Sequence, residues 1–140
     1  MDVVTVFGAS GFIGRYVVAE IAKSGARVRA AVRRPDRAGF LKPMGDVGQV
    51  TPVAANIRND ASVAAAVDGA DTVINLVGIL FSRNKQTFES LQADGALRVA
   101  RAAKTTGAKR LVQVSAIGAD ARSESAYAST KGIGEQNVQE

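Results

Sequence analysis

The sequence contains no cysteine and no histidine. Without cysteine, the chain can form neither a disulfide framework nor a thiolate nucleophile. Without histidine, the usual metal sites and the catalytic triads built on an imidazole base are excluded. The composition therefore excludes enzymes that depend on a cysteine nucleophile or a catalytic histidine, and it predicts a protein without a metal centre.

Long apolar runs are also missing. No segment approaches the ~20 apolar residues that a membrane-spanning helix needs. The first strand pattern begins at Val3, which leaves no room for a signal peptide. We therefore expect a cytoplasmic protein with no membrane span of its own.

Basic charge is in excess, but not in the pattern of a nucleic-acid-binding protein. The formal net charge is +5, and residues 1–37 hold seven basic and three acidic side chains. A nucleic-acid surface would need lysine and arginine clustered along one face together with stacking aromatic residues, and the sequence shows neither. We expect no nucleic-acid partner.

Alternating strand and helix patterns indicate a single α/β domain. With 46% hydrophobic residues, a chain of 140 residues can fill one core but not two. The β-branched run at residues 3–7 predicts a strand buried on both faces, so we expect a Rossmann-type doubly wound parallel sheet of about five strands in the order 3-2-1-4-5. Pro52 places the third strand at a sheet edge. The expected strands are 3–7, 27–32, 50–54, 72–76 and 110–115, and the expected helices are 11–24, 37–42, 60–67, 87–106 and 126–140.

Three glycines separate the first strand from the first helix. Gly8 allows a sharp turn off the strand, Gly11 allows the backbone to approach a pyrophosphate, and Gly14 allows close helix–strand packing. The free N–H groups of the first helical turn would then face the phosphates. The alternative is a purely structural strand-to-helix turn. The loop residues expected to bind a dinucleotide are Gly8, Ser10, Gly11, Phe12, Ile13 and Gly14.

Arg33 and Arg34 follow the second strand, where an NAD site would carry an acidic residue for the ribose hydroxyls. Guanidinium groups at this place suit a 2′-phosphate, and charge-assisted contacts of this kind contribute about 1.5–3 kcal/mol each. The pair therefore favours NADP(H) over NAD(H). The alternative is a solvated charge pair at a strand end.

Residues at or just beyond the carboxyl ends of the third, fourth and fifth strands would line the same crevice, because these ends meet at one edge of the sheet. Those at the end of the third strand would reach the adenine, and those at the end of the fourth would run along the cofactor. A serine at the end of the fifth strand would add a hydroxyl group. These positions could equally be ordinary loop starts. They are Asn56, Ile57, Leu76, Val77, Gly78 and Ser115.

Tyr127 and Lys131 are four residues apart, so on a helix they share a face. A lysine ammonium near a phenol favours the phenolate, which would make Tyr127 a general acid/base near neutral pH. Lys131 would also reach the nicotinamide ribose hydroxyls. A chance spacing is the alternative, since lysine is a common residue.

The motifs at residues 8–14 and 75–78, with Ser115, Tyr127 and Lys131 in order, resemble those of the short-chain dehydrogenase/reductase superfamily, in its extended and atypical members of NAD-dependent epimerase/dehydratase type. The resemblance covers the whole chain. It implies that Tyr127 is the catalytic acid/base, that Lys131 favours the phenolate form of Tyr127, and that Ser115 orients the substrate. In such proteins a smaller substrate-binding part follows, so residues 1–140 look like an NADP-binding Rossmann domain that forms an N-terminal half.

A narrower similarity lies in residues 73–80, 88–92, 111–120 and 123–127, which look like the superfamily's accessory subunit of respiratory complex I (NADH:ubiquinone oxidoreductase) in bacterial form. Members of that group hold NADPH as a mainly structural nucleotide on the peripheral arm. The resemblance therefore implies subunits of a large respiratory complex as partners. It also implies a peripheral position at the inner membrane, reached through that complex.

The catalytic pattern of the superfamily is incomplete in this chain. Ser115 is followed by Ala116 and Ile117, and Gln92 stands where many active relatives carry an asparagine. The sequence therefore favours an accessory subunit that holds NADP(H) mainly for stability. The alternative is an active NADP-dependent oxidoreductase or nucleotide-sugar epimerase/dehydratase that uses Tyr127 and Lys131.

Overall fold

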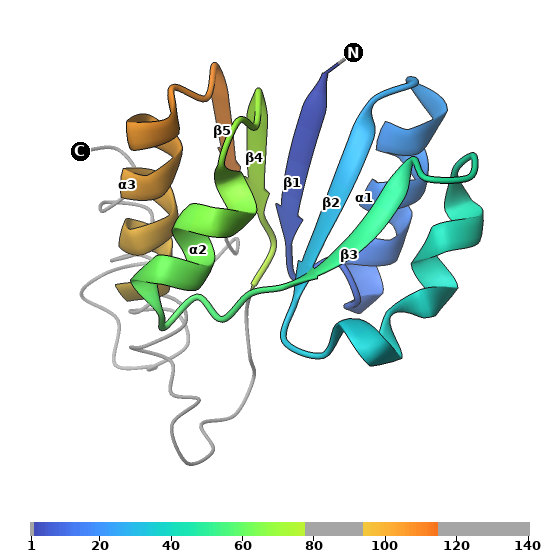
Figure 1. The fold of residues 1–140 in the computed structure, drawn as a ribbon, viewed down its shortest axis with the longest axis horizontal. Coiled ribbons are helices and arrows are strands. Elements are labelled where there is room, and N and C mark those ends of the chain that lie inside the picture. Colours follow the sequence, from blue (N-terminus) through green and yellow to red (C-terminus); the bar gives the residue numbers. More distant parts are fainter. Residues whose placement is uncertain (1, 78–93, 115–140) are drawn as a thin grey trace.

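The computed structural model describes residues 2–77 and 94–114, which form one parallel sheet with helices on both faces (Figure 1). The strand order is β3-β2-β1-β4-β5, which confirms the expected doubly wound topology. The strands are β1 (Val3–Phe7), β2 (Arg27–Val32), β3 (Val50–Ala54), β4 (Thr72–Asn75) and β5 (Arg110–Gln113). The α-helices are α1 (Phe12–Lys23), α2 (Asp60–Val67) and α3 (Gly95–Thr106).

Strand β1 lies at the centre of the sheet. It pairs in parallel with β2, from Val3 opposite Arg27 to Phe7 opposite Ala31, and with β4 on its other side. Successive side chains of a strand point to opposite faces. Val6 is accordingly buried in one core and Phe7 in the other, so the prediction of a strand buried on both faces is confirmed.

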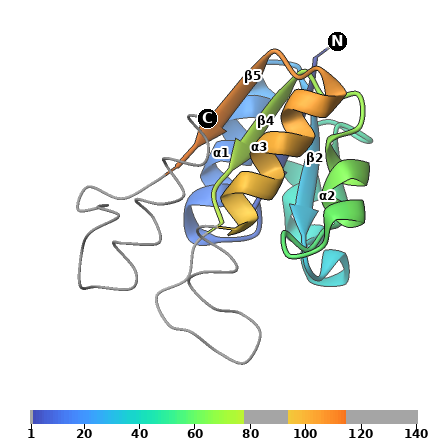
Figure 2. The same cartoon turned by 90° about the vertical axis from the view of Figure 1, so that its left-hand side faces the viewer.

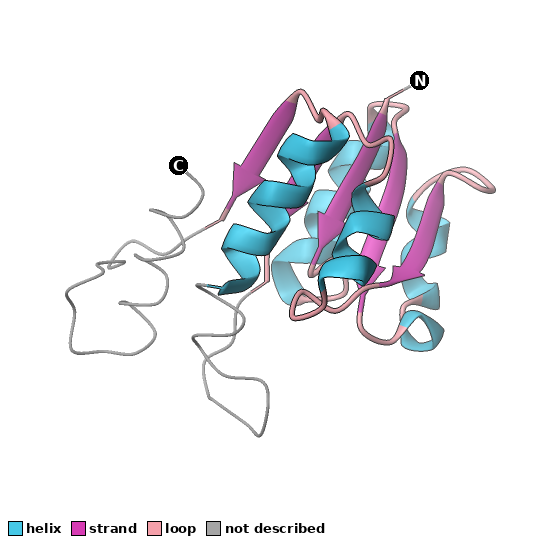
Figure 3. Ribbon diagram, turned by 60° about the vertical axis from the view of Figure 1, so that its left-hand side comes forward, coloured by secondary structure: helices cyan, strands magenta, loops and turns pink. Residues whose placement is uncertain are grey.

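The two faces are covered by different helices. Helix α1 packs Val18 and Ala22 into the core of one face. Helices α2 and α3 lie side by side on the other face, where Val63 and Val99 are buried together with Phe7 (Figure 2, Figure 3). The molecule therefore has three layers, and the sheet is the middle one.

Strand β3 is at the edge of the sheet, as Pro52 predicted. Proline has no N–H to donate to a ladder on its outer side, so an edge strand tolerates it. The segment between β2 and β3 differs from the expected single helix at 37–42. It forms two short 3₁₀-helices, η1 (Pro35–Arg37) and η2 (Gly39–Met44); Pro35 starts the first, and Pro43 inside the second has no N–H for a helical hydrogen bond.

Helix α3 begins at Gly95, inside the longer helix expected at 87–106, with Gly95 and Val99 on its buried face. Residues 87–93 lie outside the described residues, as does the expected helix at 126–140. In the parts of the chain that the structure describes, no helix is both long and apolar enough to span a bilayer.

Candidate functional site

The carboxyl ends of β1 and β4 form the candidate nucleotide site. The connection from β1 to β2 passes through α1 on one face, whereas the connection from β4 to β5 passes through α3 on the opposite face. The direction of winding therefore reverses between β1 and β4. In open α/β sheets, such a switch point is where ligands bind.

Gly8 makes the turn off β1 with a φ of +78°, a left-handed conformation that favours glycine. Its N–H donates to the Ala31 carbonyl at 3.2 Å, which ties the loop to β2. A Cβ at position 8 would lie 3.2 Å from both the Leu76 carbonyl carbon and the Val77 nitrogen. The loop is thus packed directly against the residues expected to run along the cofactor.

Gly14 lies against the same loop from the helix side. A Cβ there would be 2.3 Å from the Gly8 carbonyl oxygen and 2.6 Å from that of Ala9, so a side chain cannot fit without movement of the backbone. A Cβ at Gly11 would meet only the Gly8 oxygen, at 3.4 Å. Gly14 therefore allows α1 to pack closely on the loop that leaves β1, and a Cβ at Gly11 would meet little.

The first turn of α1 is available to an anion. Ser10, Gly11, Phe12 and Ile13 are all exposed, and the turn carries no acidic side chain. Unopposed N–H groups and the positive end of the helix dipole make such a turn a favourable site for phosphate. The arrangement fits a dinucleotide pyrophosphate.

The two arginines after β2 have different surroundings. Arg34 donates from Nε and Nη2 to the two carboxylate oxygens of Asp36, at 3.2 and 2.9 Å. This hydrogen-bonded ion pair raises the pKa of Arg34 and lowers the pKa of Asp36. Arg33 is exposed and lines a hollow between the ends of β2 and β3 and the start of α2.

This hollow, which we call the β2–β3 hollow, has a volume of about 390 Å³, within the usual range of about 300–1,000 Å³ for small-ligand sites. Its lining combines two guanidinium groups, two side-chain amides, one hydroxyl and two methyl groups. It lies where the sequence predicted the adenine end of the cofactor. The lining residues are Arg33, Ala54, Ala55, Asn56, Arg58, Asn59 and Ser62.

The loop that forms one wall of the hollow is fixed by hydrogen bonds. The Ser62 hydroxyl accepts from the Asn56 N–H and donates to the Asn56 carbonyl, both at 2.9 Å. Asn59 caps α2 by accepting from the Ser62 N–H at 2.9 Å. Ile57 is buried in the core together with residues of α2 and α3, and it does not line the hollow. Arg98 of α3 donates to the Ile57 carbonyl and to Asp60.

Asn75 is a residue whose role the sequence analysis missed. It is 1% exposed, and its amide Nδ2 donates to the Gln113 side chain at 3.0 Å, linking the ends of β4 and β5. Its Oδ1 accepts from the Val77 N–H at 3.0 Å and so fixes the residues packed on Gly8. The signal in the sequence that could have indicated this role is the polar Asn75 directly after the apolar residues Val73 and Ile74.

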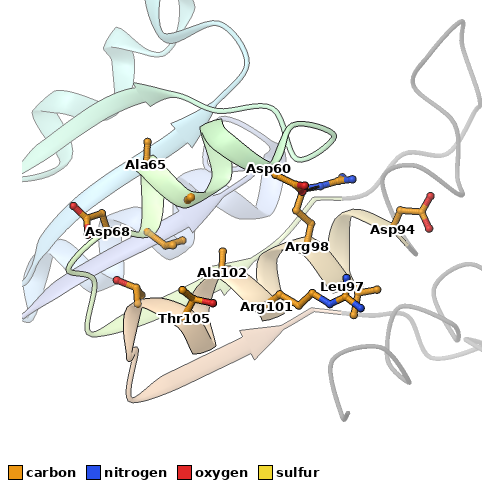
Figure 4. A pocket seen from close by; sticks show the side chains of 12 residues that line it. Asp60, Ala65, Asp68, Asp94, Leu97, Arg98, Arg101, Ala102 and Thr105 are labelled. Carbon is orange, nitrogen blue, oxygen red and sulfur yellow. Dashed lines mark hydrogen bonds and ion pairs between the residues drawn. The ribbon is translucent and has the colours of Figure 1, made fainter.

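A larger hollow of about 840 Å³ runs along the outside of α2 and α3 and contains no residue of the glycine loop. Figure 4 shows Arg98 of α3 beside Asp60 of α2, with Ala102 and Thr105 further along α3. The lining of this hollow combines apolar residues, such as Ala65 and Ala102, with charged and hydroxyl side chains. It is therefore separate from the nucleotide crevice.

Four of the predicted site residues, Gly78, Ser115, Tyr127 and Lys131, lie outside the described residues, so their roles remain predictions. Over residues 2–77 and 94–114, the structure contains no group of three or more acidic, histidine or cysteine side chains that could hold a metal ion.

A doubly wound parallel sheet with a glycine loop at its switch point defines a dinucleotide-binding Rossmann domain. The family described as NAD(P)H-binding matches residues 8–136, and the chain belongs to this family. The putative NAD-dependent epimerase/dehydratase from Bacillus halodurans has a similar structure, with a TM-score of 0.83 at 23% identity over 99% of this chain and 65% of its own. At that identity the likeness shows the fold alone.

The sequence is also similar to longer curated proteins. The NADH-ubiquinone oxidoreductase 40 kDa subunit, mitochondrial, of Neurospora crassa is 37% identical over 96% of this chain and 36% of its own length. The NADH dehydrogenase (ubiquinone) 1 alpha subcomplex subunit 9, mitochondrial, of Arabidopsis thaliana is 39% identical over 97% of this chain and 34% of its own. The ceramide reductase of Caulobacter vibrioides is 33% identical over 97% of this chain and 41% of its own. The chain spans about a third of the length of the first two relatives.

Proposed function

We propose that the chain is the NADP(H)-binding domain of an accessory subunit of respiratory complex I, in which the nucleotide serves mainly to stabilise the fold. The observation that carries this proposal is the glycine loop, closed between Gly14 and the Leu76–Val77 backbone and open at Gly11. The names of the Neurospora and Arabidopsis relatives support the assignment to the respiratory enzyme.

In this proposal the pyrophosphate lies on the first turn of α1, over Gly11 to Ile13. The positive charge of Arg33 and Arg34 at the end of β2 selects NADP(H) over NAD(H). Leu76 and Val77 run along the cofactor from the other side. A ligand that binds only the folded state at a hundred times its Kd stabilises that state by about 2.7 kcal/mol.

The partners in this proposal are other subunits of a large respiratory complex. The protein would lie on the cytoplasmic side of a bacterial inner membrane and be held there through that complex. Comigration of the chain with NADH:ubiquinone oxidoreductase activity on a native gel of solubilised membranes tests this part. Recovery of the chain apart from that activity would contradict it.

A second function, an NADP-dependent oxidoreductase or nucleotide-sugar epimerase/dehydratase, is favoured by the relative named as a ceramide reductase. In that case Tyr127 would be the general acid/base, Lys131 would favour its phenolate, and Ser115 would orient a carbonyl substrate. The nucleotide crevice would be the same in both functions.

The test begins with protein purified without added nucleotide, whose bound ligand is released by denaturation and identified by mass spectrometry. Oxidation of NADPH is then measured with a panel of carbonyl substrates. Copurified NADPH that no substrate oxidises supports the accessory-subunit proposal. Turnover that Tyr127→Phe abolishes supports the reductase instead, and copurified NAD(H) alone contradicts the selection of NADP(H).

A further inference from the structure

The β2–β3 hollow carries two arginines, Arg33 from the segment after β2 and Arg58 from the loop after β3. Its lining residues include Arg33 and Arg58 but no carboxylate and no large apolar side chain. Side-chain amides and a hydroxyl supply the remaining polar groups. Such a lining suits a compact, doubly charged anion far better than an apolar ring.

The backbone brings these two arginines to the same place. β2 and β3 are parallel with Val32 opposite Ala54, and the Ala55 N–H donates to the Val32 carbonyl at 2.9 Å. Arg33 therefore leaves β2 beside the residues that leave β3. The chain then turns, because the Asn56 Oδ1 accepts from the Arg58 N–H at 3.0 Å, and this turn places Arg58 on the wall of the hollow.

Arg58 is held on a rigid support. The Ser62 and Asn59 hydrogen bonds fix the loop to the start of α2, and Arg98 holds the Ile57 carbonyl from α3. Arg58 is also half-buried, whereas Arg33 is exposed. A guanidinium on a fixed, partly desolvated wall binds phosphate with less loss of side-chain entropy than one on a free loop.

Arg34 is directed elsewhere. The Arg34 guanidinium donates two hydrogen bonds to the Asp36 carboxylate, and Arg34 does not line the hollow. Its charge still contributes to the local field, but a phosphate in the hollow would have to compete with Asp36 for its guanidinium.

We propose that Arg58, together with Arg33, forms the seat of the 2′-phosphate of NADP(H), and that Arg58 is the residue that determines NADP(H) specificity from the β3 side. This proposal rests on the proposed binding of NADP(H). The sequence pattern pointed only to the arginines after β2, because the position of Arg58 depends on side-chain hydrogen bonds within the loop after β3.

The test measures binding of adenosine 2′,5′-bisphosphate and adenosine 5′-monophosphate to the 140-residue chain by calorimetry. These probes differ only in the 2′-phosphate. Arg58→Gln is expected to weaken the bisphosphate by about ten- to a hundredfold and to leave the monophosphate nearly unchanged. Arg27→Gln is the matched control, since Arg27 is exposed at the opposite end of β2 and loses the same charge.

The outcomes distinguish the role of Arg58 from the binding of NADP(H). If Arg58→Gln weakens both probes equally, or weakens neither, the proposed role of Arg58 is overturned. The proposal of NADP(H) binding still stands in that case, provided that the unchanged protein prefers the bisphosphate. If the unchanged protein does not prefer the bisphosphate, both the phosphate seat and the NADP(H) selection fail. If Arg58→Gln does not fold by circular dichroism, Arg58→Lys replaces it; because lysine lacks the two-pronged donor, a loss of bisphosphate affinity alone is expected again.

Discussion

Gly14 and the Gly8 carbonyl are so close that a Cβ at position 14 would lie 2.3 Å from the oxygen. This contact joins the first helix to the turn that follows the central strand. Because Gly8 itself packs on the backbone of Leu76 and Val77, the close approach of these three segments depends on two glycines, Gly8 and Gly14.

We expect Gly14→Ala to destabilise the protein by about 2–3 kcal/mol, because overpacking forces the helix away from the loop. Nucleotide affinity should fall with it, since the N–H groups of the turn move. Urea unfolding and NADPH titration measure the two effects. Gly39→Ala is the control, because a Cβ there would meet nothing within 4 Å, and a loss of similar size in that variant would contradict the steric explanation.

Thr5 and Arg29 both donate to the Ala66 carbonyl at the end of α2, at 2.8 and 3.1 Å. We expect Thr5→Val, which keeps the shape of the buried side chain, to cost about 1 kcal/mol of unfolding free energy. Arg29→Met should cost a similar amount. The double variant should lose more than the sum, because only then does the carbonyl lack both donors, and strictly additive losses in a double-mutant cycle would refute this shared role.

Asn75 should matter for both stability and nucleotide binding. Asn75→Ala leaves the Val77 N–H and the Gln113 amide without their buried partner, so we expect a loss of about 2 kcal/mol in urea unfolding and weaker NADPH binding. Gln113→Ala removes one of these two contacts and keeps the bond to Val77. Gln113→Ala should therefore leave NADPH affinity closer to that of the unchanged protein than Asn75→Ala does. A larger loss of NADPH affinity in Gln113→Ala than in Asn75→Ala would be evidence against this role of Asn75.

The Arg34–Asp36 pair predicts a pH dependence. Hydrogen bonding to Arg34 lowers the pKa of Asp36, so the pair favours the folded state above the pKa that Asp36 has in the unfolded chain, ordinarily about 3.9. This contribution is lost as the pH falls through the lower, folded-state pKa. An NMR titration of the Asp36 carboxyl should show its pKa rising in Arg34→Gln and unchanged in Arg27→Gln.

Much of this fold could be predicted because its signals are local. The β-branched run at 3–7, the edge proline at 52 and the alanine-rich segment at 60–67 each predicted an element that the structure contains with nearly the same bounds. The segment between β2 and β3 was less predictable, because two short 3₁₀-helices have no strong periodicity and depend on packing, such as the burial of Leu41.

The sequence by itself determined the alternating α/β class and the glycine loop, because these depend on short-range patterns and on the freedom of glycine. Only the tertiary structure decided which charged and polar groups meet. The distance from Arg34 to Asp36, the sharing of the Ala66 carbonyl and the link from Asn75 to Gln113 are side-chain contacts. The placement of Arg58 on the wall of the hollow likewise depends on side-chain hydrogen bonds within the loop after β3.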